Sequence, residues 1–129
     1  MVRIHFILYV KDQLKSTSFY TTLLALEPTL NVPGMTEFEL PGGSILGLMP
    51  ENGIAKIISG PLPHPSTANG APRCELYLLE KDFGAVYERA NKAGARSINK
   101  AKDRDWGHRV AYFADPDGHV IAVACELGN

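Results

Sequence analysis

Two polar side chains at matching places in the chain are the first candidates for chemistry. After Arg3, His5 is the one strongly polar residue in an apolar run that continues to Val10. An offset of 70 residues brings His5 onto Glu75 and Asp12 onto Asp82, at the same point of two strand-to-helix units. A carboxylate beside an imidazole favours the charged imidazolium. Such a pair could bind a polar ligand group, act as a general base, or form a hydrogen bond with no further role.

Aromatic side chains with a common strand phase form a second candidate site. Residues two apart on a strand face the same side, so Trp106, His108 and Tyr112 share one phase. Tyr77 likewise shares the phase of Glu75. If both sets face one space, they line a site with aromatic walls and a few polar groups, which suits a flat or amphipathic small molecule. The alternative is that these aromatics simply close a core.

The elements that must position these residues occur twice. Apolar and β-prone segments predict strands at 2–10, 29–32, 36–40 and 44–49, and again at 73–79, 95–98, 107–114 and 119–126. Asp12 can cap a helix to about Leu26 with an apolar stripe that includes Leu14, and Asp82 can cap a second helix that Gly94 ends. The predicted order is β-α-β-β-β, a connection, and β-α-β-β-β.

The connection at 50–72 differs in composition. It holds five of the nine prolines, at positions 50, 61, 63, 65 and 72. A connection of this length is usually functional or a linker, and Ile54–Ile58 could form a short strand within it. His64 is a candidate lid residue there. We therefore expect a single domain over 1–129, with module 1 at 1–49 and module 2 at 73–129.

Composition excludes several classes of protein. Thirteen Lys and Arg against 14 Asp and Glu give a net charge of −1, with 45% hydrophobic and 21% charged residues. These values are ordinary for a globular protein and argue against nucleic-acid binding. The longest apolar run is far shorter than the ~20 residues that span a bilayer, and no signal peptide is visible. Two cysteines are too few for a disulfide scaffold, which favours a cytoplasmic protein.

The tandem modules and the stretch 106–118, which ends in Asp115-Pro116-Asp117-Gly118, resemble the vicinal oxygen chelate superfamily. This superfamily includes glyoxalase-type lyases, extradiol dioxygenases, fosfomycin-modifying transferases and bleomycin-resistance proteins. The resemblance implies an α+β fold in which two βαβββ modules form a curved, incompletely closed mixed sheet around a cleft, with the helices outside. It also implies a homodimer. A tyrosine at the position of Tyr112 touches the substrate in the fosfomycin-modifying relatives, although cross-strand packing would also explain this residue.

The resemblance further implies four metal-ligand positions, of which two lack a donor. His5 and Glu75 occupy the first-strand positions, whereas Gly47 and Ala122 occupy those of the last strands. Catalytic zinc usually has three protein ligands and an open position. The further candidates for an irregular ligand set are Glu37, Glu51, His108 and Glu126. A site for a divalent metal (Zn, Ni, Mn or Fe) is therefore the alternative, and the absence of a cofactor is the first expectation.

Three functions follow from this pattern. The first is a binder of a small organic molecule in the cleft between the modules, of the sequestration or resistance type, with Tyr77, Trp106, His108 and Tyr112 as ligand-binding residues. The second is a metal-dependent lyase, isomerase or dioxygenase of the glyoxalase type with irregular ligands. The third is a metal-free enzyme in which His5 and Glu75 transfer protons as catalytic residues.

The remaining reactive side chains are expected to be structural. His119 follows the turn glycine and is predicted to be a turn or surface residue. Cys74 and Cys125 are out of phase with Glu75 and Ala122, so both are predicted to pack away from the cleft as small hydrophobic side chains.

Overall fold

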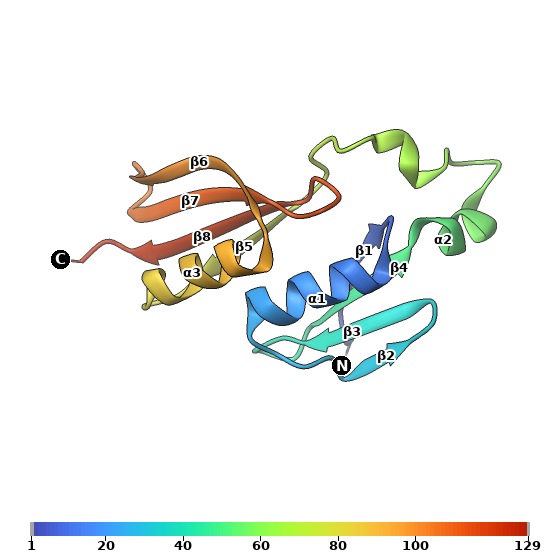
Figure 1. Ribbon diagram of the computed structural model, residues 1–129, viewed down its shortest axis with the longest axis horizontal. Helices are drawn as coiled ribbons and strands as arrows, with labels where there is room; N and C mark the ends of the chain where they lie inside the picture. The colour runs from blue at the N-terminus through green and yellow to red at the C-terminus, as the bar shows by residue number, and fades with distance from the viewer. Residues whose placement is uncertain (1, 129) are drawn as a thin grey trace. The chain divides into compact units, whose positions relative to one another are not determined.

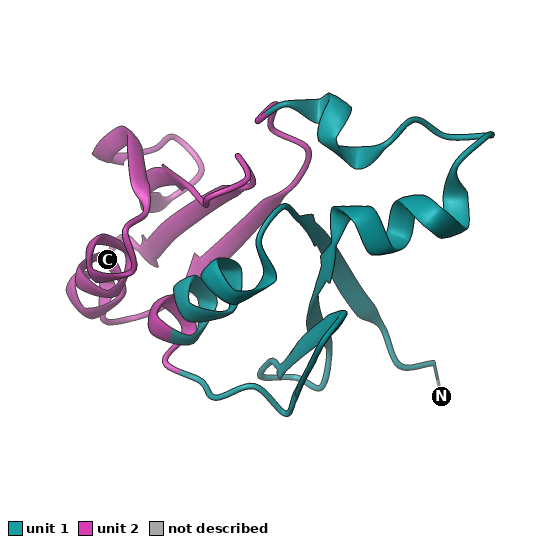
Figure 2. Ribbon diagram, turned by 45° about the vertical axis from the view of Figure 1, so that its right-hand side comes forward, with its two compact units in different colours: residues 1–21, 26–69 teal, residues 22–25, 70–129 magenta. Residues whose placement is uncertain are grey.

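The computed structural model describes residues 2–128 and divides into two compact units, which Figure 2 shows in different colours. The first unit extends to Thr21 and includes Leu26–Asn69, and the second comprises Thr22–Ala25 and the chain from Gly70 onward. The elements are β1 (His5–Val10), α1 (Gln13–Leu24), β2 (Leu30–Val32), β3 (Met35–Glu39), β4 (Ile45–Pro50), α2 (Glu51–Ile58), a 3₁₀ helix (Pro65–Ala68), β5 (Glu75–Leu79), α3 (Phe83–Ala93), β6 (Arg96–Asp103), β7 (His108–Ala114) and β8 (Val120–Glu126) (Figure 1). None of the helices within residues 2–128 has the length and apolar character needed to cross a membrane.

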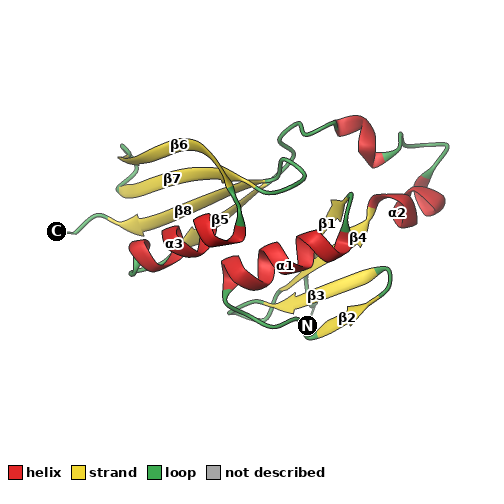
Figure 3. Ribbon diagram, in the orientation of Figure 1, coloured by secondary structure: helices red, strands yellow, loops and turns green. Residues whose placement is uncertain are grey.

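The first module is a four-stranded mixed sheet in the order β1-β4-β3-β2, in which only β1 and β4 run parallel. The Asp12 carboxylate accepts a hydrogen bond from the Lys15 backbone N–H at 3.1 Å, as expected for the cap of α1. The helix lies on one face of the sheet (Figure 3). Buried Thr36 on β3 lies 2.9 Å, oxygen to oxygen, from the hydroxyl of Thr17, and it accepts from Gln13 at 2.9 Å. These bonds satisfy polar groups that burial would otherwise penalise.

The second module repeats this plan with the order β5-β8-β7-β6, in which β5 and β8 run parallel. Asp82 caps α3 by accepting from the Ala85 backbone N–H, and Gly94 ends the helix in the left-handed conformation at φ +87°. Between α3 and the sheet, the rings of Tyr87 and Phe113 meet edge to face with centroids 5.4 Å apart. The predicted pair of βαβββ modules is confirmed, and each is an open four-stranded mixed sheet.

The connection contains helix where a strand was expected. The prediction of a strand at Ile54–Ile58 is wrong, because these residues complete α2. Pro50 precedes the helix and Glu51 lies in its first turn, where a carboxylate interacts favourably with the helix dipole. The ring of His64, the candidate lid residue, is held within the connection. Its Nδ1 accepts from the Ser66 N–H, and its Nε2 lies 2.9 Å from the Asn52 side-chain oxygen.

Two other details depart from the pattern. Leu14 was predicted on the apolar stripe of α1, but it is 80% exposed. The side chains of α1 that are buried in the core include Phe19 and Tyr20. In the first two turns of α1 the polar side chains of Gln13 and Thr17 contact the sheet instead. Strand β6 extends five residues past the predicted end at position 98, to Asp103, because it pairs irregularly with β7 through two register shifts.

Candidate functional site

The face of the second sheet that α3 leaves uncovered carries most of the predicted site residues. Phe113 packs toward α3 through Tyr87, so residues in the opposite phase of β7 lie on the other side of the sheet. We call this side the helix-free face. It comprises Glu75, Tyr77 and Leu79 on β5, Ala122, Ala124 and Glu126 on β8, and His108, Val110 and Tyr112 on β7.

A hydrogen-bonded aromatic group occupies one end of the helix-free face. The Trp106 indole N–H donates to the Tyr77 hydroxyl oxygen at 2.9 Å, and this oxygen lies 2.6 Å from Nδ1 of His108. An indole can only donate, so the Tyr77 oxygen accepts from Trp106 and keeps its own hydrogen for the imidazole. The Tyr77 and His108 ring centroids are 5.7 Å apart. The structure thus brings three of the four predicted ligand-binding residues into one group, which we call the Trp-Tyr-His group.

Small side chains on β8 make this contact possible. Tyr77 and His108 belong to β5 and β7, and β8 lies between these strands. Ala122 is the direct neighbour of Tyr77 on one side and of Tyr112 on the other. Ala122 and Ala124 are both fully buried in a small apolar cluster against which Tyr112 packs. A large side chain at either alanine would block the path of the Tyr77 side chain across β8.

Tyr112, the fourth predicted ligand-binding residue, lies beside two charges of opposite sign. The guanidinium carbon of Arg104 is 5.2 Å from the centroid of the Tyr112 ring. Burial raises the pKa of Tyr112 above its ordinary value of 10.0, the Glu75 carboxylate raises it further, and Arg104 opposes both effects. The Tyr112 hydroxyl is therefore a neutral hydrogen-bond donor throughout the physiological range.

We expect a pH titration to show this environment. A raised pKa means that the folded state favours the protonated phenol, so the contribution to stability is present below pH 10 and is lost as the pH rises through the folded pKa. The ultraviolet difference at 295 nm between the wild type and Tyr112→Phe should show Tyr112 ionising above the ordinary tyrosine value. Glu75→Gln should shift this ionisation to lower pH, and an unchanged midpoint in Glu75→Gln would contradict the proximity of the carboxylate.

Arg104 is a member of this site that strand-phase reasoning missed. It precedes the turn between β6 and β7, where its backbone N–H donates to the His108 carbonyl at 2.8 Å. Phase counting along β6 fails because the strand shifts register twice against β7. The available signal was that Arg104 lies two residues before Trp106, between the predicted strands at 95–98 and 107–114.

A hollow of about 460 Å³ adjoins the same end of the helix-free face. Its lining residues are Leu79, Glu80, Lys81, Glu126, Leu127 and Gly128. Glu126 is the direct cross-strand neighbour of His108, and the Leu127 backbone N–H donates to the Gly107 carbonyl. The hollow therefore adjoins the Trp-Tyr-His group.

His5 has a nearby acid in its own module. Its Nδ1 lies 3.6 Å from a carboxylate oxygen of Glu37, with His5 on β1 and Glu37 on β3. Glu37 is the register partner of Gly47 on the intervening strand β4. Glu75 lies at the start of β5 in the second module. The pairing of His5 with Glu75 stays a prediction.

The four positions implied by the family resemblance do not form a metal-ligand set. A Cβ at Gly47 would lie 3.2 Å from Ile7 Cγ1 and 3.4 Å from Met35 Sδ, so neighbouring side chains fill the space that a ligand would need. Ala122 is fully buried and carries no donor atom. The four positions supply one imidazole and one carboxylate, whereas catalytic zinc sites usually supply three protein ligands.

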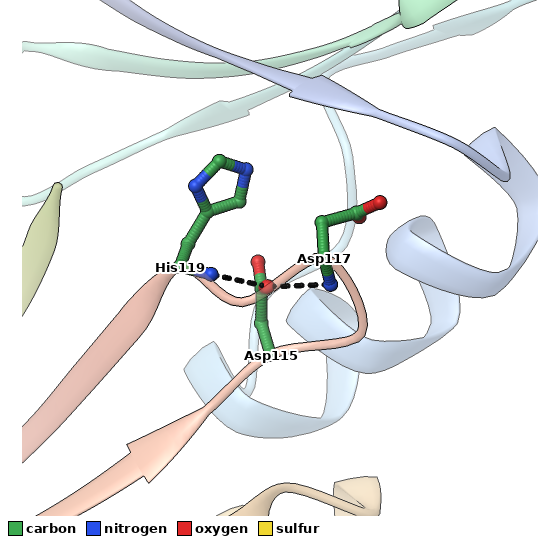
Figure 4. A group of neighbouring side chains, drawn as sticks. All are labelled: Asp115, Asp117 and His119. Atoms are coloured by element: carbon green, nitrogen blue, oxygen red, sulfur yellow. Dashed lines mark hydrogen bonds between the residues drawn. The ribbon is translucent and has the colours of Figure 1, made fainter. Parts of the chain in front are cut away.

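Within residues 2–128, one group of three potential metal-binding side chains does occur, at the turn between β7 and β8. Asp115, Asp117 and His119 each offer a ligand atom, and these atoms lie within 4.8 Å of one another (Figure 4). An Asp115 carboxylate oxygen accepts from the backbone N–H groups of Asp117 at 2.8 Å and of His119 at 2.9 Å. These contacts are those of a capped turn, and they give the group a structural role.

His119 and Cys74 are neighbours in the second module. His119 is a turn residue, as predicted, and it is only 4% exposed. Its ring nitrogens lie 3.4 Å from the Arg73 guanidinium, and its Nδ1 lies 3.5 Å from the Cys74 sulfur. Cys74 as a residue is exposed, and it contacts this imidazole rather than a hydrophobic core. Partial burial of the thiol, followed by the negative charge of Asp115, raises the pKa of Cys74.

Known proteins with similar sequences and folds identify the family of this chain. The profile of the glyoxalase-like domain family matches residues 4–128. The uncharacterized protein YraH of Bacillus subtilis is 29% identical over 121 residues, which cover 90% of this chain and 91% of that protein. Solved structures with the same fold include a glyoxalase/bleomycin resistance protein/dioxygenase from Nocardioides (TM-score 0.79, 23% identity, 100% of this chain and 85% of that chain) and a glyoxalase-related enzyme from Fulvimarina pelagi (TM-score 0.81, 19% identity, 97% and 88%).

A protein of unknown function from Agrobacterium tumefaciens is also similar, with a TM-score of 0.79 and 26% identity over 98% of this chain and 95% of that chain. The family match covers nearly the whole chain and both modules. The chain therefore belongs to the glyoxalase-like domain family of the vicinal oxygen chelate superfamily.

Proposed function

We propose that this protein binds a small aromatic organic molecule on the helix-free face of its second sheet, without a metal ion. The observation that carries the proposal is the Trp-Tyr-His group, in which the hydrogen bonds of the polar atoms hold three rings in one arrangement. Rings fixed in this way lose little conformational freedom when a ligand stacks on them. Such a face is preorganised for a planar ligand.

The exposure of the rings supports binding rather than core packing. Trp106 is 53% exposed and Tyr77 is 37% exposed, although both are large and partly apolar. Solvent-exposed aromatic rings that are held in place by hydrogen bonds are frequent at binding sites. The adjoining hollow of about 460 Å³ has the size of small-molecule sites.

The donor set supports a metal-free role. Ala122 and Gly47 replace two of the four expected ligands, and tightly packed neighbours surround both positions. A binder of the sequestration type needs affinity for its ligand and no transition-state chemistry. We therefore expect that one equivalent of Zn, Ni, Mn or Fe does not raise the melting temperature. A metal that bound the folded state specifically would raise it.

The single tryptophan makes the proposal directly testable. Trp106 is the only tryptophan in the chain, so fluorescence excited at 295 nm, where tyrosine hardly absorbs, reports on the Trp-Tyr-His group. Titration with phenol, benzoate, benzamide and benzylamine should give saturable quenching by at least one compound. Tyr77→Phe removes the acceptor of Trp106 and the partner of His108, so we expect the affinity of that compound to fall roughly three- to tenfold.

The matched control is Tyr87→Phe, which removes a hydroxyl from a tyrosine that faces Phe83 and Phe113 on the helix side. This variant should bind as the wild type does. The proposal is overturned if no compound quenches Trp106 saturably, or if both tyrosine variants bind equally well.

A further inference from the structure

We propose that Arg104 is the anion-recognising residue of this site, so that the bound molecule is a planar aromatic compound that carries a carboxylate. The inference rests on the proposed function, because it assigns the class of ligand to the same face.

One nitrogen of Arg104 holds the guanidinium in place. Nη2 donates to the Val110 carbonyl at 2.9 Å, to the Asn99 side-chain oxygen at 2.8 Å and to the Lys100 carbonyl at 3.3 Å. The group also lies over the Tyr112 ring. All of these partners are neutral. The position of the guanidinium is therefore determined before any ligand arrives, and its positive charge is not neutralised by these contacts.

The other nitrogens of Arg104 lack acceptors. Nε is the only buried side-chain nitrogen or oxygen atom in residues 2–128 that has no hydrogen-bond partner. Nη1 makes no hydrogen bond to the described part of the chain. Nε is closed to solvent, whereas Nη1 is not among the buried atoms without a partner and is therefore accessible to an acceptor on a ligand.

Two other arginines of the chain have a carboxylate within ion-pair distance, and Arg104 does not. Arg3 lies 3.4 Å from Glu39, and Arg109 lies 2.8 Å from Asp103. No carboxylate of residues 2–128 lies within ion-pair distance of Arg104. Both forks of a guanidinium include Nη2, which the protein occupies here, so a ligand carboxylate is expected to accept from Nη1. A hydrogen bond from a charged donor to a carboxylate is stronger than a neutral one.

The surroundings of Arg104 define the rest of the ligand. Trp106 follows two residues later in the same turn, and Tyr112 lies directly beneath the guanidinium. A carboxylate at Arg104 thus places an attached ring among the aromatic side chains of the helix-free face. Glu75, whose charge acts on Tyr112, disfavours the same anion and reduces its affinity.

A purely structural role predicts a different result. If Arg104 only joined the hairpin to β7, Nη2 alone would suffice, and the charge of a ligand would not matter. The test therefore compares benzoate, benzamide and benzylammonium, which share a ring and differ in charge. They are titrated at pH 7 into ¹⁵N-labelled protein, and the backbone amides and the Arg104 Nε–H signal are followed by NMR.

We expect benzoate to bind about tenfold more tightly than benzamide, with benzylammonium weakest, and to shift the Arg104 Nε–H signal. Glu75→Gln, which removes an exposed carboxylate, should strengthen benzoate binding about threefold and leave benzamide unchanged. Arg104→Met should abolish the preference for benzoate. Arg109→Met is the matched control, because it removes an arginine from the opposite phase of β7, and it should keep that preference.

Glu75→Gln keeps the test decisive if Arg104→Met does not fold. Binding that is independent of charge, or strongest for benzylammonium, overturns the inference and leaves the proposed function standing. If none of the three compounds shifts any signal of the helix-free face, both the proposed function and the inference are overturned.

Discussion

Replacing Ala122 with glutamate is expected to destabilise the protein by about 3–5 kcal/mol, the cost of leaving a buried charge without a partner. Ala122 is the position at which the family resemblance implies a metal-binding carboxylate. It is fully buried, and Tyr77 and Tyr112 are its direct neighbours on the adjoining strands. The longer side chain would have to displace the tyrosines or place its charge among apolar groups. Either outcome also disrupts the Trp-Tyr-His group.

Thermal unfolding followed by circular dichroism measures this effect, and a loss of about 10–20 °C in melting temperature is expected. Leu79→Glu is the matched control, because Leu79 lies on the same face but is 45% exposed. The same carboxylate placed there should cost less than about 1 kcal/mol. Adding Zn, Ni or Mn to Ala122→Glu should not restore stability. Recovery with metal would show that His5, Glu75 and the new carboxylate form a ligand set, and would contradict the metal-free proposal.

Replacing Gly118 with alanine is expected to cost about 3 kcal/mol or more, because two separate penalties combine at one position. Gly118 has φ +90°, a conformation that costs an L-residue about 1–2 kcal/mol. A Cβ there would also clash with the Gly70 backbone, coming within 2.8 Å of its carbonyl carbon and closer still to its oxygen. Backbone atoms cannot rotate away as a flexible side chain can. The turn that positions Asp115 and His119 would have to move.

Gly107→Ala separates the two penalties. Gly107 has φ +89°, but a Cβ there would meet no atom within 4 Å. This control should therefore show only the conformational cost of about 1–2 kcal/mol. Urea denaturation of both variants gives the comparison. Equal losses in the two variants would mean that the approach of Gly70 to the turn contributes nothing to stability.

Much of the architecture could be predicted because its signals are local. Asp12 and Asp82 each accept from a backbone N–H three residues later, as helix caps do, and Gly94 ends its helix in the left-handed conformation. Alternation predicted one phase for His108 and Tyr112, and both lie on the helix-free face. The strand predicted at Ile54–Ile58 failed because a short apolar run has no clear period, and the prolines around it suggested a loop.

The candidate site could be predicted only in part. Strand phase grouped Trp106 with His108 and Tyr77 with Glu75, but it could not show that the two sets share one face or bond to one another across β8. Strand-phase reasoning missed Arg104, because two register shifts in β6 interrupt the alternation of side chains on which it depends. Glu37 lies beside His5 through the pairing of β1, β4 and β3, which an offset between the two modules does not reveal.

By itself, the sequence determined the two βαβββ modules, the turn at Asp115–Gly118 and the absence of donor atoms at positions 47 and 122, because these follow from short-range periodicity, capping and residue identity. The tertiary structure alone decided which side chains meet. Contacts across a sheet depend on register and on the size of the residues between two strands, and the small Ala122 and Ala124 let Tyr77 reach His108. Register also places Arg104 over Tyr112, where its Nε is buried without a hydrogen-bond partner.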